Sequence, residues 1–440
     1  MEAYKLNDSK IIWQGFVPDH WKKDKLFRLC EKMGSGGTPT STNENYYSGS
    51  IPWIQSGDLT DSYVSKTKKT ITEEALNNSS AKMFSRGTLL VALYGATIGK
   101  LGIMKMDAAT NQACCALQVS KKFFSKFTYY LMLDMRQLLI SEAYGGSQPN
   151  ISQETLKHQY MFIPNINEQK AIADYLDQAC QNIDKTISLK QQQLDKLEAY
   201  RKSVIHEAVT KGLDKTVMMK DSRVELFGEI PQAWRMHRIK GIVKTKITDG
   251  PHETPQLDES GIPFISAEAI KANKIDFNKK RGFISQELHE IYSKKCKPQK
   301  FDIFIIKSGA TTGNVAYVDT DLEFNIWSPL ALVRCQETLA DYKFIYYQLL
   351  GDVFRKQVEL AWSFGTQENI GMGVLGRIKI SLPPLHEQKE IAKYLDDVCG
   401  KINKTKEITK NQIKTLTQYR QSLIHECVTG KKRIYQGETH

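Results

Sequence analysis

The chain of 440 residues is long enough for two or three domains with cores of their own. Its hydrophobic content of 41% and charged content of 25% are ordinary for a globular protein, and no apolar run approaches the length that crosses a bilayer. The formal net charge of +12 and pI of about 9.1 favour a polyanionic partner, most often nucleic acid, although some globular proteins are simply basic.

The beginning of the chain, "MEAYKLNDSKIIWQGF", has no apolar signal core. The eight cysteines show no C-x-x-C spacing, and Cys180 and Cys399 fall inside helical patterns. We therefore expect reduced, structural thiols in a cytoplasmic protein with no membrane partner, no bound metal and no cofactor.

The stretch "VALYGATIGKLG", residues 91–102, looks like a phosphate-binding loop but departs from one in three ways. Only three residues separate its glycines, where a Walker loop has four, and Leu101 follows Lys100 in place of Ser or Thr. Residues 101–104 predict a strand, not the helix whose N-terminus would face a phosphate. The pattern recurs at 305–316 with Asn314 in place of the lysine. We predict glycine-rich turns between apolar strands; the functional alternative is a turn that lets the backbone approach a nucleic-acid phosphate.

The chain is an internal duplication. Residues 163–210 and 382–429 align without a gap, and nearly half of the positions are identical. Weaker matches precede these blocks, such as "GFVPDHW" with "GEIPQAW" and "KFTYYLML" with "KFIYYQLL". Each half therefore holds a globular segment followed by a long helix, and the globular segments have diverged more. We predict a first globular domain at 1–162, a first helical spacer at 163–213, a second globular domain at 214–381, and a second helical spacer with the C-terminal tail at 382–440.

Apolar residues in both helical segments recur every seven positions, which is typical of a coiled-coil seam. The predicted seam consists of Leu176, Ile183, Leu197, Val204, Leu395, Ile402, Leu416 and Leu423. Such a helix could also lie on the core of its own domain. Two equivalent helices with narrow seams favour packing on each other.

No catalytic residues are predicted. The only Pro-Pro pair, Pro383-Pro384, is followed by Leu385, whereas an adenine methyltransferase would carry Pro-Pro-Tyr/Phe. "HEAVT" at His206 and "HECVT" at His425 begin like H-E-x-x-H zinc sites but lack the second histidine. These histidines are predicted to cap or pack the helix ends.

Two diverged copies of one domain suggest that the protein recognises two separate parts of one long ligand. DNA repeats about every 34–36 Å along one face, so a basic protein with two heads can read two short sequences separated by an unread gap. Divergent heads would read different sequences, which makes the site asymmetric. The nearly identical helices would present two equivalent docking surfaces for two copies of a partner.

These motifs, in duplicated order, resemble a known family. "SGGTPT" at 35–40, "TDGPHETP" at 248–255, the paired GAT-x-G turns and the paired "EQK-x-IA-x-YL" helices look like the specificity subunit of type I restriction–modification systems. The resemblance implies an α+β chain of two similar mixed α/β target-recognition domains, separated by long helices packed as an antiparallel coiled coil with a pseudo-two-fold axis. It also implies a two-part site on double-stranded DNA, two methyltransferase subunits as partners, and restriction subunits in the assembled complex.

Residues that could contact DNA are predicted on exposed loops, because amides, hydroxyls and basic groups read base edges and phosphates. The candidates of the first half are Thr38, Thr40, Ser41, Gln55, Ser56, Lys66, Lys68, Lys69, Tyr94, Thr97, Lys100, Gln148 and Asn150. Those of the second half are Thr248, Asp249, His252, Thr254, Ser266, Lys294, Lys295, Lys297, Ser308, Thr311, Gln367 and Asn369. For each of them, ordinary turn chemistry or a solvated surface is the alternative. A stand-alone two-headed nucleic-acid-binding scaffold without modification partners is the alternative for the whole chain.

Overall fold

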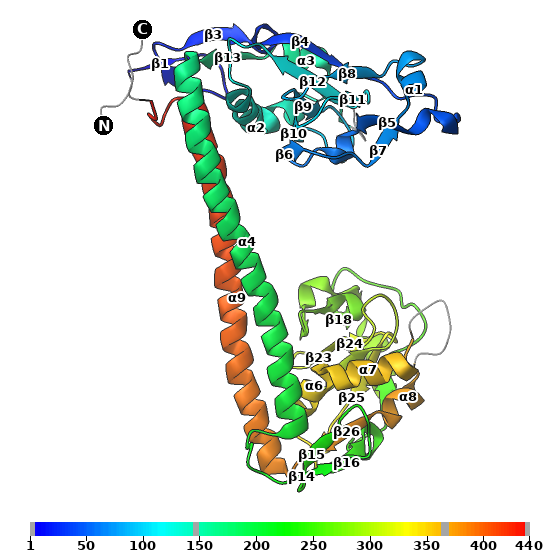
Figure 1. Ribbon diagram of the computed structural model, residues 1–440. Helices are drawn as coiled ribbons and strands as arrows, with labels where there is room; N and C mark the ends of the chain where they lie inside the picture. The colour runs from blue at the N-terminus through cyan, green and yellow to red at the C-terminus, as the bar shows by residue number, and fades with distance from the viewer. Residues whose placement is uncertain (1–4, 144–148, 362–368, 436–440) are drawn as a thin grey trace. The chain divides into compact units, whose positions relative to one another are not determined.

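Two long helices organise the structure, a computed structural model that describes residues 5–143, 149–361 and 369–435 (Figure 1). They are α4 (Ile166–Lys211) and α9 (Leu385–Val428). The chain forms two compact units, unit 1 from Met1–Lys190 with Asn411–His440 and unit 2 from Gln191–Lys410. Each unit therefore contains one head of strands and short helices and a stretch of both long helices.

Local chemistry sets the ends of these helices. The side chain of Asn165 caps α4 by accepting hydrogen bonds from the N–H groups of Asn167 and Glu168 at 3.1 and 3.0 Å. Gly212 and Gly430 follow the ends of α4 and α9 with φ values of +74° and +73°. This left-handed conformation suits glycine and terminates a helix.

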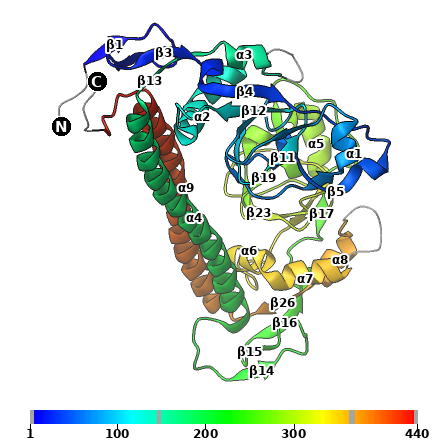
Figure 2. The same cartoon turned by 45° about the horizontal axis from the view of Figure 1, so that its top comes forward.

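The two helices pack together in each unit. In unit 1, Leu176 and Ile183 of α4 share an apolar cluster with Leu423 and Ile424 of α9. In unit 2, the cluster contains Val204 of α4 and Leu395 of α9. The N-terminal part of α4 packs against the C-terminal part of α9, and the C-terminal part of α4 packs against the N-terminal part of α9. The two helices are therefore antiparallel (Figure 2). The expected packing is confirmed, and the same clusters include residues of the heads, so the seam also belongs to the head cores.

The predicted seam positions differ in burial. Leu176, Ile183, Val204, Leu395, Ile402 and Leu423 are buried, with at most 8% exposed. Leu197 and Leu416 are half-buried. The buried positions lie where a head packs on the helix pair.

The head of unit 1 contains two main sheets, in the strand orders β4-β12-β9-β10-β6 and β7-β5-β11-β8. Two-stranded sheets β1-β2 and β13-β3 flank them. The strands are β1 (Leu6–Asp8), β2 (Phe16–Pro18), β3 (Lys22–Lys25), β4 (Cys30–Ser35), β5 (Tyr47–Ile54), β6 (Ser62–Val64), β7 (Lys69–Ile71), β8 (Lys82–Phe84), β9 (Leu89–Ala92), β10 (Leu101–Met104), β11 (Ala108–Thr110), β12 (Cys114–Val119) and β13 (Tyr160–Ile163). The helices are α1 (Glu73–Asn77), α2 (Ser125–Ser141), α3 (Gln153–Lys157) and the 3-10 turns η1 (Leu26–Leu29), η2 (Glu44–Tyr46) and η3 (Ser56–Asp58). The predicted strand at 101–104 is β10.

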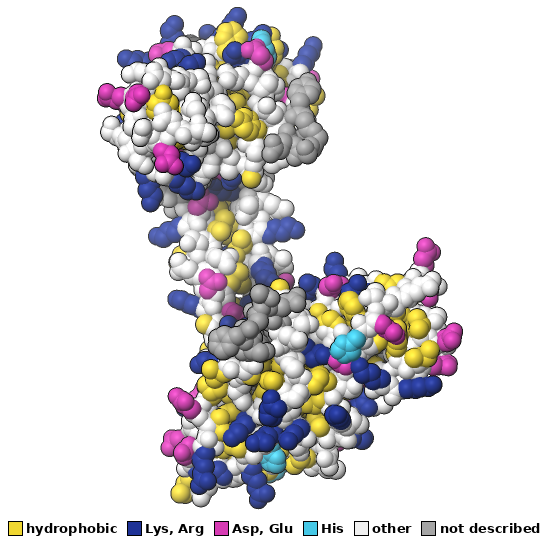
Figure 3. Space-filling view, turned by 90° about the vertical axis from the view of Figure 1, so that its right-hand side faces the viewer, with side chains coloured by type: hydrophobic (Ala, Val, Ile, Leu, Met, Phe, Trp, Pro, Cys, Tyr) yellow, Lys and Arg dark blue, Asp and Glu magenta, His cyan; other side chains and the backbone are white. Residues whose placement is uncertain are grey.

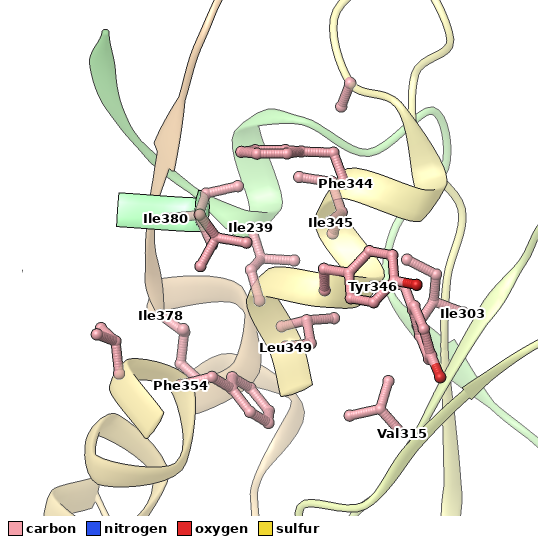
Figure 4. Close-up of a cluster of buried hydrophobic side chains, with 14 of the residues drawn as sticks. Ile239, Ile303, Val315, Phe344, Ile345, Tyr346, Leu349, Phe354, Ile378 and Ile380 are labelled. Carbon is pink, nitrogen blue, oxygen red and sulfur yellow. The ribbon is translucent and has the colours of Figure 1, made fainter. Parts of the chain in front are cut away.

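The head of unit 2 repeats this plan with one strand fewer in each main sheet, in the orders β17-β25-β22-β23 and β21-β18-β24. Pairs β14-β15, β16-β26 and β19-β20 complete it. The strands are β14 (Met219–Asp221), β15 (Glu229–Pro231), β16 (Arg235–Arg238), β17 (Thr248–Asp249), β18 (Ile262–Ile265), β19 (Ile270–Lys271), β20 (Lys274–Ile275), β21 (Gly282–Ile284), β22 (Ile303–Ile306), β23 (Val315–Tyr317), β24 (Asn325–Ile326), β25 (Leu330–Val333) and β26 (Lys379–Leu382). The helices are α5 (Gln286–Lys295), α6 (Tyr342–Leu350), α7 (Asp352–Ala361), α8 (Met372–Arg377) and the turns η4 (Ile239–Gly241), η5 (Ala267–Ala269) and η6 (Phe277–Lys279). Figure 4 shows apolar side chains such as Phe344, Leu349 and Ile303 converging between α6 and the sheet.

Each head is joined to the start of its helix by the same set of contacts. In unit 1, Trp21 Nε1 donates to Glu168 at 3.2 Å, and Tyr130 donates to Asp177 at 2.8 Å. Lys126 pairs with the same Asp177.

Unit 2 repeats this joint with residues at matching places in the repeat. Trp234 Nε1 donates to Glu387 at 2.9 Å, and Tyr347 donates to Asp396 at 2.8 Å. Lys343 pairs with Asp396. The duplication therefore extends to the way in which each head is fixed to its helix.

Candidate nucleic-acid interface

Unit 1 gathers five of its predicted residues around one cavity of about 580 Å³. Its lining includes Thr38, Ser41, Gln55, Lys68 and Lys69. Strands β5 and β7 bring them together, because they pair antiparallel and the residue after β5 then lies beside the start of β7. Hydroxyl, amide and ammonium groups thus surround one hollow, a composition suited to base edges and phosphates.

Two aromatic residues form part of this cavity, and sequence reasoning missed both. Trp53 is 1% exposed and donates from Nε1 to the Gly37 carbonyl at 3.2 Å, while Tyr47 donates to the Pro39 carbonyl at 2.8 Å. Their ring centroids are 6.0 Å apart. These bonds fix the loop that carries Thr38. The match of "SIPWIQ" with "GIPFIS", which places an aromatic residue at Trp53 in one half and at Phe264 in the other, was the sequence signal that could have indicated this structural role.

The remaining candidates near this cavity lie outside it. Thr40 and Lys66 are exposed, and Ser56 is half-buried in η3. Within the described residues, Lys66, Lys68 and Lys69 make no salt bridge.

The first glycine-rich turn holds Lys100 in an internal ion pair. Its Nζ lies 2.8 Å from Asp61, which also pairs with Arg136. Burial alone would raise the pKa of Asp61, but hydrogen bonds from Lys100 and from the Leu101 N–H, and the Arg136 charge, outweigh it and lower the pKa. The Lys100 charge is therefore partly neutralised inside unit 1. Thr97 of this turn is half-buried.

The two turns occupy matching places in the two units. Tyr94 forms an isolated antiparallel bridge with Asn150, and Ser308 forms one with Asn369. Each turn is thus tied to the segment that precedes the last strand of its head. Thr311 is exposed in the second turn. Gln148 and Gln367 lie outside the described residues.

Unit 2 has a cavity of about 600 Å³ whose lining includes Thr248, Asp249, Lys295 and Lys297. Asp249 is 5% exposed and lies within salt-bridge distance of Lys295, Lys307 and His252. Burial acts to raise the pKa of Asp249, but the hydrogen bonds and charges of Lys295 and Lys307 lower it. These contacts make Asp249 an internal counter-ion of the cavity wall.

Other candidates of unit 2 divide into buried and exposed groups. Ser266 is 3% exposed, and Lys297 pairs with Glu323 at 2.7 Å. His252, Thr254 and Lys294 are exposed. Sequence reasoning also missed Arg281, whose guanidinium lies 4.1 Å from the centroid of the Trp327 ring.

No group of three or more His, Cys, Asp or Glu side chains in the described residues could hold a metal ion. All eight cysteines are free thiols, and burial is the largest cause that raises the pKa of Cys115 and Cys335 to about 12. At neutral pH these thiols are therefore protonated and poor nucleophiles. Among the described residues, no helix is both long and apolar enough to span a membrane.

The histidine near the end of α9 contacts the head of unit 1, whereas its counterpart near the end of α4 makes no such hydrogen bond through Nδ1 among the described residues. His425 Nδ1 lies 3.0 Å from a carboxylate oxygen of Asp134. His206 Nδ1 is buried without a hydrogen-bond partner in the described structure. In both repeats the threonine at the fifth position donates back to the histidine carbonyl, Thr210 at 2.6 Å and Thr429 at 2.5 Å.

Two related heads, each joined to the same antiparallel helix pair and each with a polar, basic hollow, define a two-headed recognition protein. The family model of the "Type I restriction modification DNA specificity domain" matches residues 18–199 and again 231–416. The chain therefore belongs to this family, as a specificity subunit that carries two copies of the domain. Specificity subunits are DNA-recognition components.

Curated relatives extend along the whole chain. The chain is 26% identical to the type I restriction enzyme MjaIX specificity subunit of Methanocaldococcus jannaschii, covering 96% of this chain and 95% of the relative. It is 21% identical to the EcoKI specificity subunit of Escherichia coli, covering 87% and 82%.

Solved structures share the fold. One, described as the structural basis of complex assembly and conformational transition of the type I R-M system, matches with a TM-score of 0.71 at 17% identity, covering 94% of this chain and 98% of that one. The HsdS subunit of Thermoanaerobacter tengcongensis matches with a TM-score of 0.54 at 15% identity, with the same coverage.

Replacing Asp249 by Asn should destabilise unit 2, because Lys307 has only 11% of its side chain exposed and would lose its carboxylate partner. Breaking a buried ion pair from one side costs about 3–5 kcal/mol, measurable by urea unfolding. The folded pKa of Asp249 lies below the unfolded value of about 3.9. The contribution of the pair is thus fully present above about pH 4 and is lost as pH falls through the folded pKa. The variant should lack this acid-dependent loss.

The matched control is Asp321→Asn. Asp321 pairs with Lys300 at 2.7 Å, but its side chain is 80% exposed. Exposed pairs contribute little to stability, so this variant should unfold like the parent. An equally stable Asp249→Asn protein would contradict the counter-ion role.

Proposed function

We propose that the two heads each read one part of an asymmetric two-part site on double-stranded DNA, and that the helix pair docks two methyltransferase subunits. Restriction subunits join through the assembled complex. The chain itself is proposed to be non-catalytic and to act in the cytoplasm, where its free thiols are stable.

The observation that carries this proposal is the contrast between divergent heads and a repeated joint. The joint contacts of Trp21, Glu168 and Asp177 recur at Trp234, Glu387 and Asp396. The cavities differ in place and lining, because Gln55 and Lys69 line that of unit 1 beside β5 and β7, whereas Thr248 and a paired Asp249 line that of unit 2 beside β17. Different linings favour different sequences, while equal joints favour two copies of one partner.

The matching positions also differ in exposure. Gln55 follows β5 and lines its cavity, whereas Ser266 follows β18 and is 3% exposed. We assign Gln55, Thr38, Ser41, Lys68 and Lys69 to contact with DNA in unit 1. In unit 2, the exposed side chains of His252, Thr254 and Thr311 are better placed for such contacts than Asp249 or Ser266.

Exchanging residues 15–162 for the matching domain of a relative should change one half of the methylated site and leave the other half unchanged. The reason is that the exchanged head has its own core and its own cavity. The experiment maps methylated adenines in a genome after co-expression with the methyltransferase. A simultaneous change in both halves of the site would rule out independent reading by the two heads.

Gln55→Ala should lower discrimination at one base position of one half-site by about 1–3 kcal/mol, because an amide can bond adenine at two edge atoms. The measurement compares binding to duplexes that carry single substitutions in either half-site. Lys66→Gln is the control, because Lys66 is exposed and lies outside the cavity. Equal losses at all positions for Gln55→Ala would assign it to phosphate contact or stability instead.

Co-purification separates this proposal from a stand-alone scaffold. A tagged chain co-expressed with its methyltransferase should retain two methyltransferase subunits by native mass spectrometry, since the docking surface occurs twice. A chain that binds DNA but retains no methyltransferase would favour the scaffold alternative.

A further inference from the structure

A four-residue cationic surface on unit 2 begins at the β16-β26 pair. Arg238 lies directly opposite Lys379 in the antiparallel register. One residue further, the Ile239 N–H donates to the Ile378 carbonyl at 3.0 Å, which continues the pairing beyond the two strands. Lys240 then follows in η4, and Arg377 is the last residue of α8.

A neighbouring glycine confirms that η4 and α8 touch here. A Cβ placed on Gly376 would lie 3.5 Å from the Cβ of Lys240. Two pairs of cations, which we call rungs, therefore flank the Ile239–Ile378 hydrogen bond along the two segments: Arg238 with Lys379, and Lys240 of η4 with Arg377 of α8. We call these four residues the cationic ribbon.

The ribbon faces outward. Ile239 and Ile378, which lie between the two rungs, are 0% and 4% exposed and point into the core of unit 2 (Figure 4). Arg238, Lys240 and Arg377 are exposed, and Lys379 is half-buried. Lys and Arg side chains gather on the face of unit 2 drawn in Figure 3.

These charges are not neutralised locally. In the described part of the chain, no carboxylate lies within 4.0 Å of a charged nitrogen of any of the four. Like charges directly opposite each other on paired strands destabilise the pairing. The arrangement therefore works against folding stability and calls for an anion from outside the chain.

Unit 1 shows that the fold does not require these cations. Its corresponding rungs, on β3 and β13, hold Lys25 opposite Tyr160 and then Phe27 near His158, with the Leu26 N–H donating to the Gln159 carbonyl at 3.0 Å. Lys25 Nζ lies 4.8 Å from the centroid of the Tyr160 ring. His158 lies 3.2 Å from Glu154. The same backbone is thus built with one permanent cation in place of four.

We propose that the cationic ribbon of unit 2 binds backbone phosphates of DNA next to the bases that this head reads. The inference rests on the proposed function. Helix α8 supports the choice of partner, because its first residue, Met372, lines the cavity with Thr248 and Lys297, and its last residue is Arg377. Helix α8 therefore connects the ribbon to the polar cavity of unit 2. Phosphate contacts carry no sequence information, so the ribbon positions the duplex and strengthens binding to any sequence.

The test uses the full chain with Arg238→Gln, Lys240→Gln, Arg377→Gln and Lys379→Gln combined. Binding is measured over a range of salt concentrations, with a duplex that contains the mapped site and with one that lacks it. Each lost phosphate contact should reduce the slope of log K against log salt by about 0.9. Affinity should fall alike for both duplexes, and the methylated sequence should stay the same.

Two further combined variants serve as controls. Lys240→Phe, Arg377→His and Lys379→Tyr together install the residues that unit 1 carries at these positions, and should reproduce the loss with a thermal stability at or above the parent's. Lys389→Gln, Lys393→Gln, Lys401→Gln and Lys404→Gln together remove four exposed charges from α9 in the same unit, and should leave the slope unchanged.

An unchanged slope in both ribbon variants would overturn the proposal. Normal DNA binding together with loss of a co-purifying protein would also overturn it and assign the ribbon to protein docking. A parent chain that binds neither duplex would contradict the proposed function itself. A parent chain that binds DNA, together with a ribbon variant that binds equally well, would contradict only the ribbon proposal.

Discussion

The buried amide at the start of each long helix fixes the geometry of its unit. Gln388 is 0% exposed, accepts the Asp341 N–H at 2.8 Å, and donates to the carbonyls of Leu339 and Pro383 at 3.0 and 2.9 Å. Gln169 accepts the Phe124 N–H and donates to the Pro164 carbonyl, both at 2.9 Å. Losing one partner would leave a buried polar group unsatisfied, at about 1–3 kcal/mol. Any change in the angle between a head and its helix therefore breaks bonds that cannot be replaced by water.

This constraint explains why the heads could diverge while remaining attached in the same way. In each unit the joint consists mainly of contacts between the first turns of the long helix (α4 or α9) and one helix of the head (α2 or α6). It does not involve the loops around the cavities. Tyr317 packs edge-on against both Tyr342 and Tyr346 beside the joint of unit 2. Ile103 and Lys126 instead line an open hollow of about 600 Å³ at that place in unit 1. Large changes beside the joint are thus compatible with its retention.

The sequence predicted the features that depend on local pattern. The duplication, both long helices and their packing follow from an ungapped repeat with seven-residue periodicity. The sequence named Thr38 and Gln55 separately but did not predict the cavity that both line, because strand pairing that no local pattern specifies brings them to it. The contact between Asp249 and Lys307 joins residues 58 positions apart, and the proximity of Lys240 to the end of α8 depends on α8 lying against η4. Such contacts can be identified only from the tertiary structure, since the sequence alone does not show which of the many lysines lies beside a given carboxylate.

Because tertiary contacts decide which lysines are paired, the net charge alone says little about where a polyanion binds. The excess of +12 points to a polyanion, yet Lys100, Lys295 and Lys297 are held by carboxylates of their own unit. A lysine in such a pair contributes less to an external field than its place in the composition suggests. Lys68 and Lys69, by contrast, line a cavity and make no salt bridge among the described residues. The attraction for DNA therefore depends on where the cations outside such pairs lie, and the two heads differ in which of these cations stand beside their cavities.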